Sequence, residues 1–335
     1  MTVEFTPQVT EHRIDHLPVV VMMPHSRCNC RCVMCDIWKA NRSGNSISED
    51  ALTRIASDLA SLGTREVVLS GGEALMHPNL WALCAIIKAQ SAKITLLSTG
   101  LLLEHHAQAV TQWCDEVIVS LDGPPNLHDY IRGVPRAFDR LAQGIAALKV
   151  WRPDFPVSAR CVVQRSNYRF LPEIVTSARN IDLDRISFLA ADTDSQAFNH
   201  PDGWLGEKVA DVCLTTDESD ELCRIIDELI AQQPDAFASG FISERPDKLR
   251  RIGHYYRAMN GQSSFPTTHC NAPWVSTVIE SDGTVRPCFF HPPLGNINDG
   301  ALADILNTDK AIAFRQGLDV KTNPVCQRCV CTLHL

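Results

Sequence analysis

The sequence predicts an α/β protein, a partial (β/α)6 TIM-like barrel followed by a small C-terminal domain of one hairpin and one helix. Short apolar strands alternate with amphipathic helices along the first two thirds of the 335 residues, a pattern typical of a parallel sheet. Within residues 116–122, apolar and polar residues alternate, so one face suits a helix layer and the other a polar barrel interior. Ser281-Asp282-Gly283 separates two alternating segments, which indicates a hairpin.

The six predicted strands are short and rich in β-branched residues. They span residues 17–25, 65–70, 93–98, 116–121, 157–164 and 185–189. Apolar residues at helical spacing follow each strand. The predicted helices span residues 47–62, 79–89, 104–113, 137–148, 171–180 and 217–232, and Ser48 is predicted to cap the first of them. Right-handed crossovers between sequential parallel strands roll such a sheet into an open barrel.

The alternation in the fifth strand assigns side chains to the barrel interior. Arg160, Val162 and Gln164 share the inward face, and Cys161 lies on the helix-packed face. A buried charge without a partner is costly. A ligand is therefore the expected partner of Arg160.

After residue 192 the regular alternation of strands and helices ends. Residues 193–268 are interpreted as a connecting and capping segment that includes the last barrel helix and a second helix over 247–259. Residues 274–280 and 284–290 alternate around the hairpin turn, and 302–316 are predicted to form one helix. The predicted organisation is a leader (1–16), a barrel core (17–192), this connecting segment, and a C-terminal domain (269–335).

Composition narrows the class of protein. Hydrophobic residues make up 45% and charged residues 21%, as in ordinary globular proteins. The net charge of −8 argues against a nucleic-acid-binding surface. No apolar run reaches membrane-spanning length and no signal peptide is recognisable, so a cytoplasmic protein without a membrane partner is expected. Thiols stay reduced there, so the 14 cysteines are expected to ligate metal where they cluster and to pack elsewhere.

Three cysteines follow the first predicted strand with the spacing Cys-x3-Cys-x2-Cys: Cys28, Cys32 and Cys35. Functional groups of such barrels lie on the loops after the strands. Three thiolates on one loop can hold a [4Fe-4S] cluster and leave its fourth iron open, whereas a structural zinc site takes four ligands. The count favours the cluster over zinc or packed thiols. Cys30 is expected to be a bystander, because a fourth thiolate would close the open iron.

The chain resembles the radical S-adenosylmethionine (radical SAM) superfamily on this triplet, on Trp38, on the run Ser70-Gly71-Gly72-Glu73 that ends the second predicted strand, and on the six βα units. The resemblance covers nearly the whole chain. It implies that the open iron binds the amino and carboxylate groups of SAM. It also implies cleavage of SAM to methionine and a 5′-deoxyadenosyl radical, which abstracts a hydrogen atom from the substrate.

The resemblance also implies where SAM binds. Glycines let the backbone approach a ligand closely, and Glu73 is expected to accept a hydrogen bond from the methionyl ammonium. Arg132 is expected either to pair with Asp129 or to reach a carboxylate. Asp122 is expected to bind SAM, and the alternative is that Asp122 and Gly123 only form a turn. The expected cofactor-binding residues are Gly71, Gly72, Glu73, Ser98, Ser120, Asp122, Arg132 and Arg160.

A second set of cysteines flanks the hairpin and occupies the tail: Cys270, Cys288, Cys326, Cys329 and Cys331. A hairpin brings its flanks together, so four of these thiolates could surround a second centre. The arrangement resembles the C-terminal extension of the SPASM/twitch subgroup in its shorter form. That form implies one auxiliary [4Fe-4S] cluster held by Cys270, Cys288, Cys326 and Cys329, and a zinc ribbon is the alternative. Cys331 is spare; it could exchange with Cys329 or donate a hydrogen atom to the substrate.

The expected activity is that of a radical SAM oxidoreductase or isomerase. A small polar metabolite such as a sugar, aminocyclitol or nucleoside is favoured as substrate for oxidation, epimerisation or rearrangement. Two alternatives stay open: a maturase that modifies a ribosomal peptide, and a non-catalytic iron–sulfur electron carrier. The substrate is expected inside the barrel under a polar and aromatic cap: Asp192, Asp194, His200, Asp202, Trp204, His254, Tyr255 and Tyr256.

The cluster loop is locally basic on an acidic protein. It carries His25, Arg27, Arg31, Lys39 and Arg42. Such a surface could dock an acidic flavodoxin or ferredoxin as the reductant, and a solvated loop whose cations offset the cluster charge is the alternative.

Overall fold

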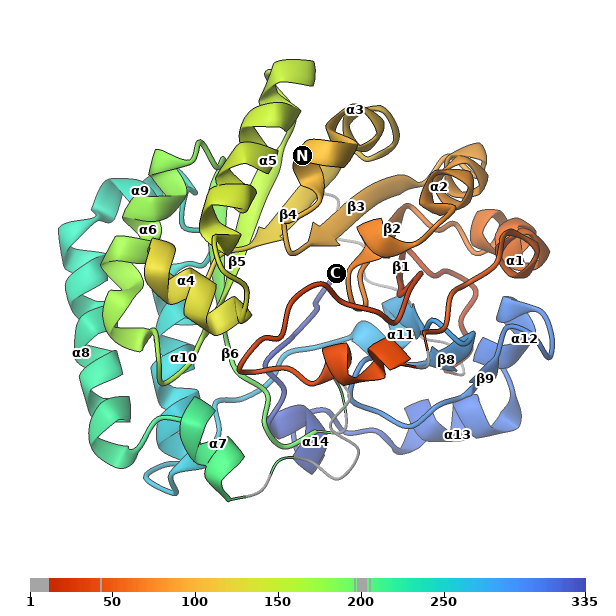
Figure 1. The fold of residues 1–335 in the computed structure, drawn as a ribbon. Helices are drawn as coiled ribbons and strands as arrows, with labels where there is room; N and C mark the ends of the chain where they lie inside the picture. The colour runs from red at the N-terminus through yellow and green to blue at the C-terminus, as the bar shows by residue number, and fades with distance from the viewer. Residues whose placement is uncertain (1–11, 43, 196, 198–203, 205) are drawn as a thin grey trace.

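A computed structural model describes residues 12–42, 44–195, 197, 204 and 206–335 (Figure 1). Most of the expected leader, residues 1–11, lies outside these ranges. Within them, every helix is too short or too polar to cross a lipid bilayer.

The described strands form one sheet in the order β6-β5-β4-β3-β2-β1-β7-β8-β9. The first six run parallel and pair in sequence order, which confirms the predicted open barrel. Their bounds are β1 Val19–Met22, β2 Glu66–Leu69, β3 Lys93–Ser98, β4 Glu116–Ser120, β5 Val157–Val163 and β6 Arg185–Ala190.

Helices follow these strands and cover the outside of the sheet, where α1, α2, α3 and α5 form an arc (Figure 1). Ser48 accepts a hydrogen bond from the Ala51 amide at the start of the first helix, as predicted. The helices of this part are α1 Glu49–Ser61, α2 Leu80–Ala89, α3 Leu103–Trp113, α4 Pro125–Arg132, α5 Ala137–Trp151 and α6 Leu171–Asn180. Three short 3-10 helices are η1 Ile37–Arg42, η2 Ala74–Met76 and η3 Tyr168–Phe170.

The predicted alternation of inward and outward residues holds in the barrel wall. Val117 is fully buried in the core, whereas Ile118 and Ser120 line interior cavities. Arg160 lines the interior as expected. Gln164 departs from this pattern, because β5 ends at Val163 and the buried Gln164 side chain lines neither cavity.

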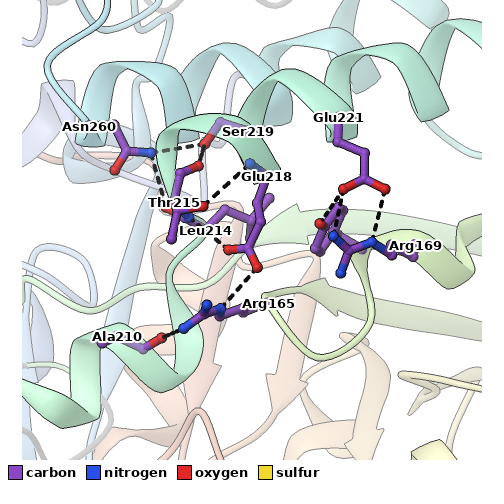
Figure 2. A network of polar contacts seen from close by, with 10 residues as sticks. Arg165, Arg169, Ala210, Leu214, Thr215, Glu218, Ser219, Glu221 and Asn260 are labelled. Carbon is purple, nitrogen blue, oxygen red and sulfur yellow. Dashed lines mark hydrogen bonds and ion pairs between the residues drawn. The ribbon is translucent and has the colours of Figure 1, made fainter.

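The connecting segment is helical, with α7 Glu207–Val212, α8 Thr216–Gln232, α9 Pro234–Ala238 and α10 Pro246–Met259. Figure 2 shows how α8 is fixed to the barrel. Glu218 completes a capping box with Thr215 and also accepts a hydrogen bond from Arg165 at 3.1 Å. One turn later, Arg169 pairs with Glu221 at 2.6 Å. These contacts attach the helix to the loop that follows β5.

The C-terminal hairpin extends the barrel sheet. β7 (Ser276–Ile279) pairs in parallel with β1, with Val19 opposite Ser276. β8 (Thr284–Arg286) and β9 (Gly295–Asn296) follow antiparallel. The predicted strand over 284–290 is shorter in the structure, because Pro287 has no amide hydrogen for the ladder. Residues 274–275 belong to α11 (Ala272–Val275) and not to the strand.

The predicted helix over 302–316 is broken into α12 (Leu302–Leu306) and α13 (Asp309–Gly317), because Thr308 caps the second helix. The buried Arg315 donates hydrogen bonds to the carbonyl oxygens of His12 at 2.6 Å and Leu306 at 2.7 Å. These contacts hold the start of the described chain against its last third. After α14 (Pro324–Gln327), the tail ends over the barrel interior (Figure 1), and Leu333 and Leu335 line a cavity there.

Candidate functional site

A cavity of about 250 Å³ opens at the carboxyl ends of the parallel strands. The cluster loop forms one wall, and the ends of β2, β3 and β4 form another. Its lining includes the three cysteines of the triplet, Ser70, Gly71, Gly72, Ser98, Thr99, Ser120, Arg132, Arg160, Asp192 and Cys331. The fold thus gathers most of the residues that the sequence singled out.

The loop that carries the triplet is held by its own side chains. Asn41 accepts a hydrogen bond from the Cys28 amide at 2.9 Å and donates one to the Cys28 carbonyl oxygen at 3.0 Å. The indole of Trp38 donates to the Cys35 carbonyl oxygen at 2.9 Å. The Ile37 amide donates to the Cys35 sulfur at 3.5 Å. The loop therefore presents Cys28, Cys32 and Cys35 on one cavity wall, which fits a cluster with three protein ligands.

Cys30 does not line the cavity. It is buried. Its interaction with Cys32, together with the nearby Arg132 charge, lowers the pKa of Cys32 to about 6. Burial raises the pKa of Cys35 to about 12. A low pKa favours the thiolate, which is the form that ligates iron.

Arg132 links the cluster loop to the end of β4. Its guanidinium forms an ion pair with Asp122 and donates to the Cys32 sulfur at 3.5 Å. Burial lowers the pKa of Arg132, but the nearby negative charges, that of Asp122 foremost, together raise it by more. The guanidinium therefore stays charged. Asp129, the partner considered from the sequence, instead accepts hydrogen bonds from the amides of Arg136 and Phe138. The expected Arg132–Asp129 pair is therefore wrong.

Asp122 is fully buried and does not line the cavity. Its second oxygen accepts a hydrogen bond from the Val162 amide at 2.9 Å. Burial raises the pKa of Asp122, and the Arg132 charge offsets part of that effect. A direct contact between Asp122 and SAM stays a prediction; in the structure, Asp122 positions Arg132.

The two glycines after β2 allow the cluster loop to pack directly on the strand end. A Cβ atom on Gly72 would lie 2.1 Å from the Arg27 carbonyl oxygen, and Gly71 has a φ of +107°. The Glu73 amide donates to the same Arg27 carbonyl oxygen at 2.8 Å. As expected, these glycines allow the backbone after β2 to approach another backbone segment closely, here that of the cluster loop.

Glu73 is fully buried and does not line the cavity. Its carboxylate accepts hydrogen bonds from the amide and hydroxyl of Thr99, both at 2.7 Å, and from the Ser98 hydroxyl at 3.0 Å. Burial raises its pKa, and the hydrogen bonds from Thr99 counteract this. Glu73 thus joins the ends of β2 and β3, and its contact with the methionyl ammonium stays a prediction.

A second cavity of about 380 Å³ occupies the barrel interior. All five C-terminal cysteines line it: Cys270, Cys288, Cys326, Cys329 and Cys331. The tail is placed here by Asn271, whose side chain donates to the Leu335 carbonyl oxygen at 2.8 Å. A thiolate-rich cavity matches the donor set of an iron–sulfur cluster. Across the described residues, no three His, Cys, Asp or Glu side chains are arranged to hold a single metal ion.

Cys331 and Arg160 line both cavities, so they lie between the two cysteine clusters. The Arg160 guanidinium lies 3.5 Å from the Ser187 hydroxyl. Cys331 is the residue that the sequence analysis left either to exchange with Cys329 or to donate a hydrogen atom.

The expected cap is met in part. Asp192 lines the first cavity. Asp194 pairs with Arg328 at 2.8 Å, and Trp204 donates to Asp36 at 2.9 Å. Tyr255 and Tyr256 are core residues, and His254 is exposed. His200 and Asp202 lie outside the described residues.

Sequence reasoning missed His291. Its imidazole Nε2 lies 3.3 Å from the Cys326 sulfur. The closeness of His291 to Cys288 in the sequence was the available signal, because histidine joins cysteine at many metal centres.

Two family models match the chain. The radical SAM superfamily model matches residues 22–162, and that of an iron–sulfur cluster-binding domain, SPASM, matches residues 270–330. These ranges contain the first cysteine triplet and most of the second cysteine set.

Curated relatives include the Methanosarcina barkeri Fe-coproporphyrin III synthase, 29% identical over 177 residues, which are 52% of this chain and 44% of the relative. The sporulation killing factor maturation protein SkfB of Bacillus subtilis is 24% identical over 301 residues, which are 87% of this chain and 65% of the relative. The aligned part spans less than two thirds of each of these relatives.

Solved structures with the same fold include Streptococcus suis SuiB bound to S-adenosylmethionine, with a TM-score of 0.65 and 15% identity over 96% of this chain and 73% of that one. Native anSMEcpe with bound AdoMet has a TM-score of 0.68 and 19% identity over 93% of this chain and 86% of that one. The TM-scores indicate a shared fold, and at identities this low the likeness supports the fold alone.

Proposed function

The chain belongs to the radical SAM superfamily and to its SPASM-type subgroup, and from this premise we propose that it is a maturase that abstracts a hydrogen atom from a peptide. Its cofactors are SAM, the [4Fe-4S] cluster that binds SAM, and an auxiliary [4Fe-4S] cluster. When bound, they supply one-electron cleavage of SAM to methionine and a 5′-deoxyadenosyl radical.

One observation carries the choice of a peptide. SkfB and the subtilosin biosynthesis protein AlbA of Bacillus subtilis align with 87% and 84% of this chain. The Fe-coproporphyrin III and heme synthases align with 52% and 46%. The matches that cover most of this chain are thus with proteins named for peptide products. This reverses the preference for a small polar metabolite that the sequence suggested.

We assign the chain's residues to roles in this reaction. Cys28, Cys32 and Cys35 hold the first cluster, and Arg132 supports the Cys32 thiolate through its hydrogen bond and charge. Gly71 and Gly72 keep the loop against the strand end. Ser98 and Ser120 line the cavity that SAM would occupy, although the Ser98 hydroxyl donates to Glu73, and Arg160 offers a cation there.

For the second centre we assign Cys270, Cys288, Cys326 and Cys329 as ligands. Cys331 is then a free thiol on the wall shared by both cavities. We assign it as a hydrogen donor: its S–H bond breaks, a C–H bond forms on the substrate radical, and the sulfur radical returns to a thiol with one electron from the reductant and one proton.

The reductant is proposed to be a flavodoxin or ferredoxin. Arg27, Arg31 and Lys39 are exposed on the cluster loop. Lys39 pairs with Asp36 at 2.8 Å, so the two arginines near Cys28 in the sequence carry the positive charge of this surface. His25 is buried and bonded to Ser46 at 2.7 Å, so it does not contribute to this surface. The side chain of Arg42 is outside the described part of the structure. Reduction by flavodoxin should slow with rising salt, and Arg27→Gln should weaken that dependence, whereas Arg245→Gln on a distant exposed site should not.

The test of the main proposal is anaerobic incubation of the reconstituted protein with SAM, dithionite and synthetic peptides encoded by short reading frames beside its gene. We expect a cognate peptide to increase 5′-deoxyadenosine release and to change in mass. Iron-coproporphyrin III and GTP serve as comparison substrates. Stimulation by one of these alone would refute the peptide proposal.

Two cysteine variants complete this test. Cys32→Ala should abolish 5′-deoxyadenosine release, because a triplet ligand is lost. Cys223→Ala removes a half-buried thiol on α8, away from both cavities, and should leave release unchanged. An electron carrier would release no 5′-deoxyadenosine in any of these variants.

A further inference from the structure

His291 is held rigidly beside the second cysteine cavity. It follows β8 and is 5% exposed. Its ring packs edge-on against Phe314 of α13, with ring centroids 5.0 Å apart. Its carbonyl oxygen accepts a hydrogen bond from Arg286 at 3.1 Å, and Arg286 is fixed by Glu280 at 2.7 Å. The imidazole therefore has little freedom to turn away from the cavity.

The Cys326 sulfur faces this imidazole at 3.3 Å from Nε2. The backbone of Cys326 is also fixed, because its amide donates to the Asn323 side chain at 3.2 Å and its carbonyl oxygen accepts from the Thr268 hydroxyl at 3.0 Å. A thiolate that ligates iron has lost its proton and can only accept a hydrogen bond. The imidazole must then be the donor, through its Nε2–H.

We propose that His291 is a positioning residue that donates a hydrogen bond to the Cys326 thiolate and thereby raises the reduction potential of the auxiliary cluster. The inference rests on the proposed role of Cys326 as a ligand. Reduction adds negative charge to the cluster and its sulfur ligands, and a hydrogen bond to a ligand sulfur stabilises that charge. Loss of the donor should therefore make the cluster harder to reduce.

The test measures the midpoint potential of the auxiliary cluster alone, by EPR-monitored redox titration of the full chain carrying Cys28→Ala, Cys32→Ala and Cys35→Ala. Iron and sulfide analysis first counts the remaining cluster. If no cluster forms in this parent protein, both the proposed ligand set and this inference are refuted. If the cluster forms, the ligand set stands and the titration decides on His291 alone.

In that parent, His291→Phe keeps an aromatic ring against Phe314 and removes the donor. We expect at least a tenfold change in the oxidised-to-reduced ratio at a fixed potential, which for one electron corresponds to a midpoint about 59 mV lower. His291→Gln places an amide N–H near the position of Nε2 and should restore most of the potential. His106→Phe is the matched control, because His106 is a half-buried histidine in ring contact with Trp81 on the outer helices.

Two results would overturn the proposal. An unchanged midpoint in His291→Phe with full iron content would show that the hydrogen bond does not tune the cluster. Loss of iron in both the Phe and Gln variants would make His291 a ligand or a structural residue, and not a donor to Cys326.

Discussion

The substitution Gly72→Ala tests whether the first cysteine loop is positioned by direct packing on the end of β2. The added Cβ would lie 2.1 Å from the Arg27 carbonyl oxygen, about 0.9 Å short of the 3.0 Å below which Cβ contacts essentially do not occur. Backbone, and not a flexible side chain, is the obstacle. Gly72 has no left-handed φ, so the substitution acts through steric contact with the backbone of Arg27 and Ser26.

The magnitude follows from what must move. Relief requires a shift of the loop by roughly 1 Å, which breaks the hydrogen bonds from the Gly72 amide to His25 (3.3 Å) and from the Glu73 amide to Arg27 (2.8 Å). Each is worth about 0.5–1.5 kcal/mol, and overpacking adds about 1–3 kcal/mol. We expect a loss of about 2–6 kcal/mol in the free energy of unfolding. Cys28 is the next residue after Arg27, and sites of this kind tolerate displacements of only about 0.5 Å.

The assay combines urea denaturation of the cluster-free chain with anaerobic reconstitution. EPR spectra with and without SAM report the open iron of the first cluster. Gly72→Ala should lose the SAM-dependent change, whereas Gly300→Ala, at a position with no neighbouring atom within 4 Å, should retain it. A Gly72→Ala protein that unfolds within about 1 kcal/mol of the wild type and responds fully to SAM would refute the packing argument.

Three further outcomes are expected. Arg132→Met leaves the Asp122 carboxylate buried without its ion-pair partner and should cost about 3–5 kcal/mol in urea denaturation, more than the double variant Arg132→Met with Asp122→Leu; equal losses would contradict the pair's role. Hydrogen bonds from Arg169 and Tyr168 lower the pKa of Glu221 to about 2. The stability they add is therefore present above the ordinary glutamate pKa of about 4.3 and is lost as pH falls toward 2. Glu221→Gln should flatten that part of the stability profile of the cluster-free chain, and an unchanged slope would contradict the role of these hydrogen bonds. Turnover of a cognate peptide in D2O should place deuterium in the product, and Cys331→Ala should abolish this while 5′-deoxyadenosine release continues; deuterium in the Cys331→Ala product would exclude that thiol as the donor.

Local patterns in the sequence predicted the barrel and the cluster loop well. The inward and outward alternation around Ile118 needs only neighbouring residues, and the spacing of Cys28, Cys32 and Cys35 lies on one loop. The Ser48 cap is equally local. Each of these features depends on residues a few positions apart, where the geometry of the chain leaves few choices.

Contacts between residues far apart in the chain could not be predicted from the sequence. Asp129 was one of two partners considered for Arg132, and it is near in the chain, yet Asp122 at the end of β4 is the partner in the structure. The hydrogen bonds that Thr99, on the next strand, donates to Glu73 could not be predicted, because the two residues lie 26 positions apart. His291 was passed over because Cys326, which it contacts, lies on the last short helix.

The parallel pairing of β1 with β7 sets an order of events during synthesis on the ribosome. More than 250 residues must be made before the partner of Val19 exists, and until then one edge of the apolar strand β1 stays open. An unpaired apolar edge promotes aggregation. Chains that stop before Ser276 should therefore be recovered mainly in inclusion bodies or bound to chaperones.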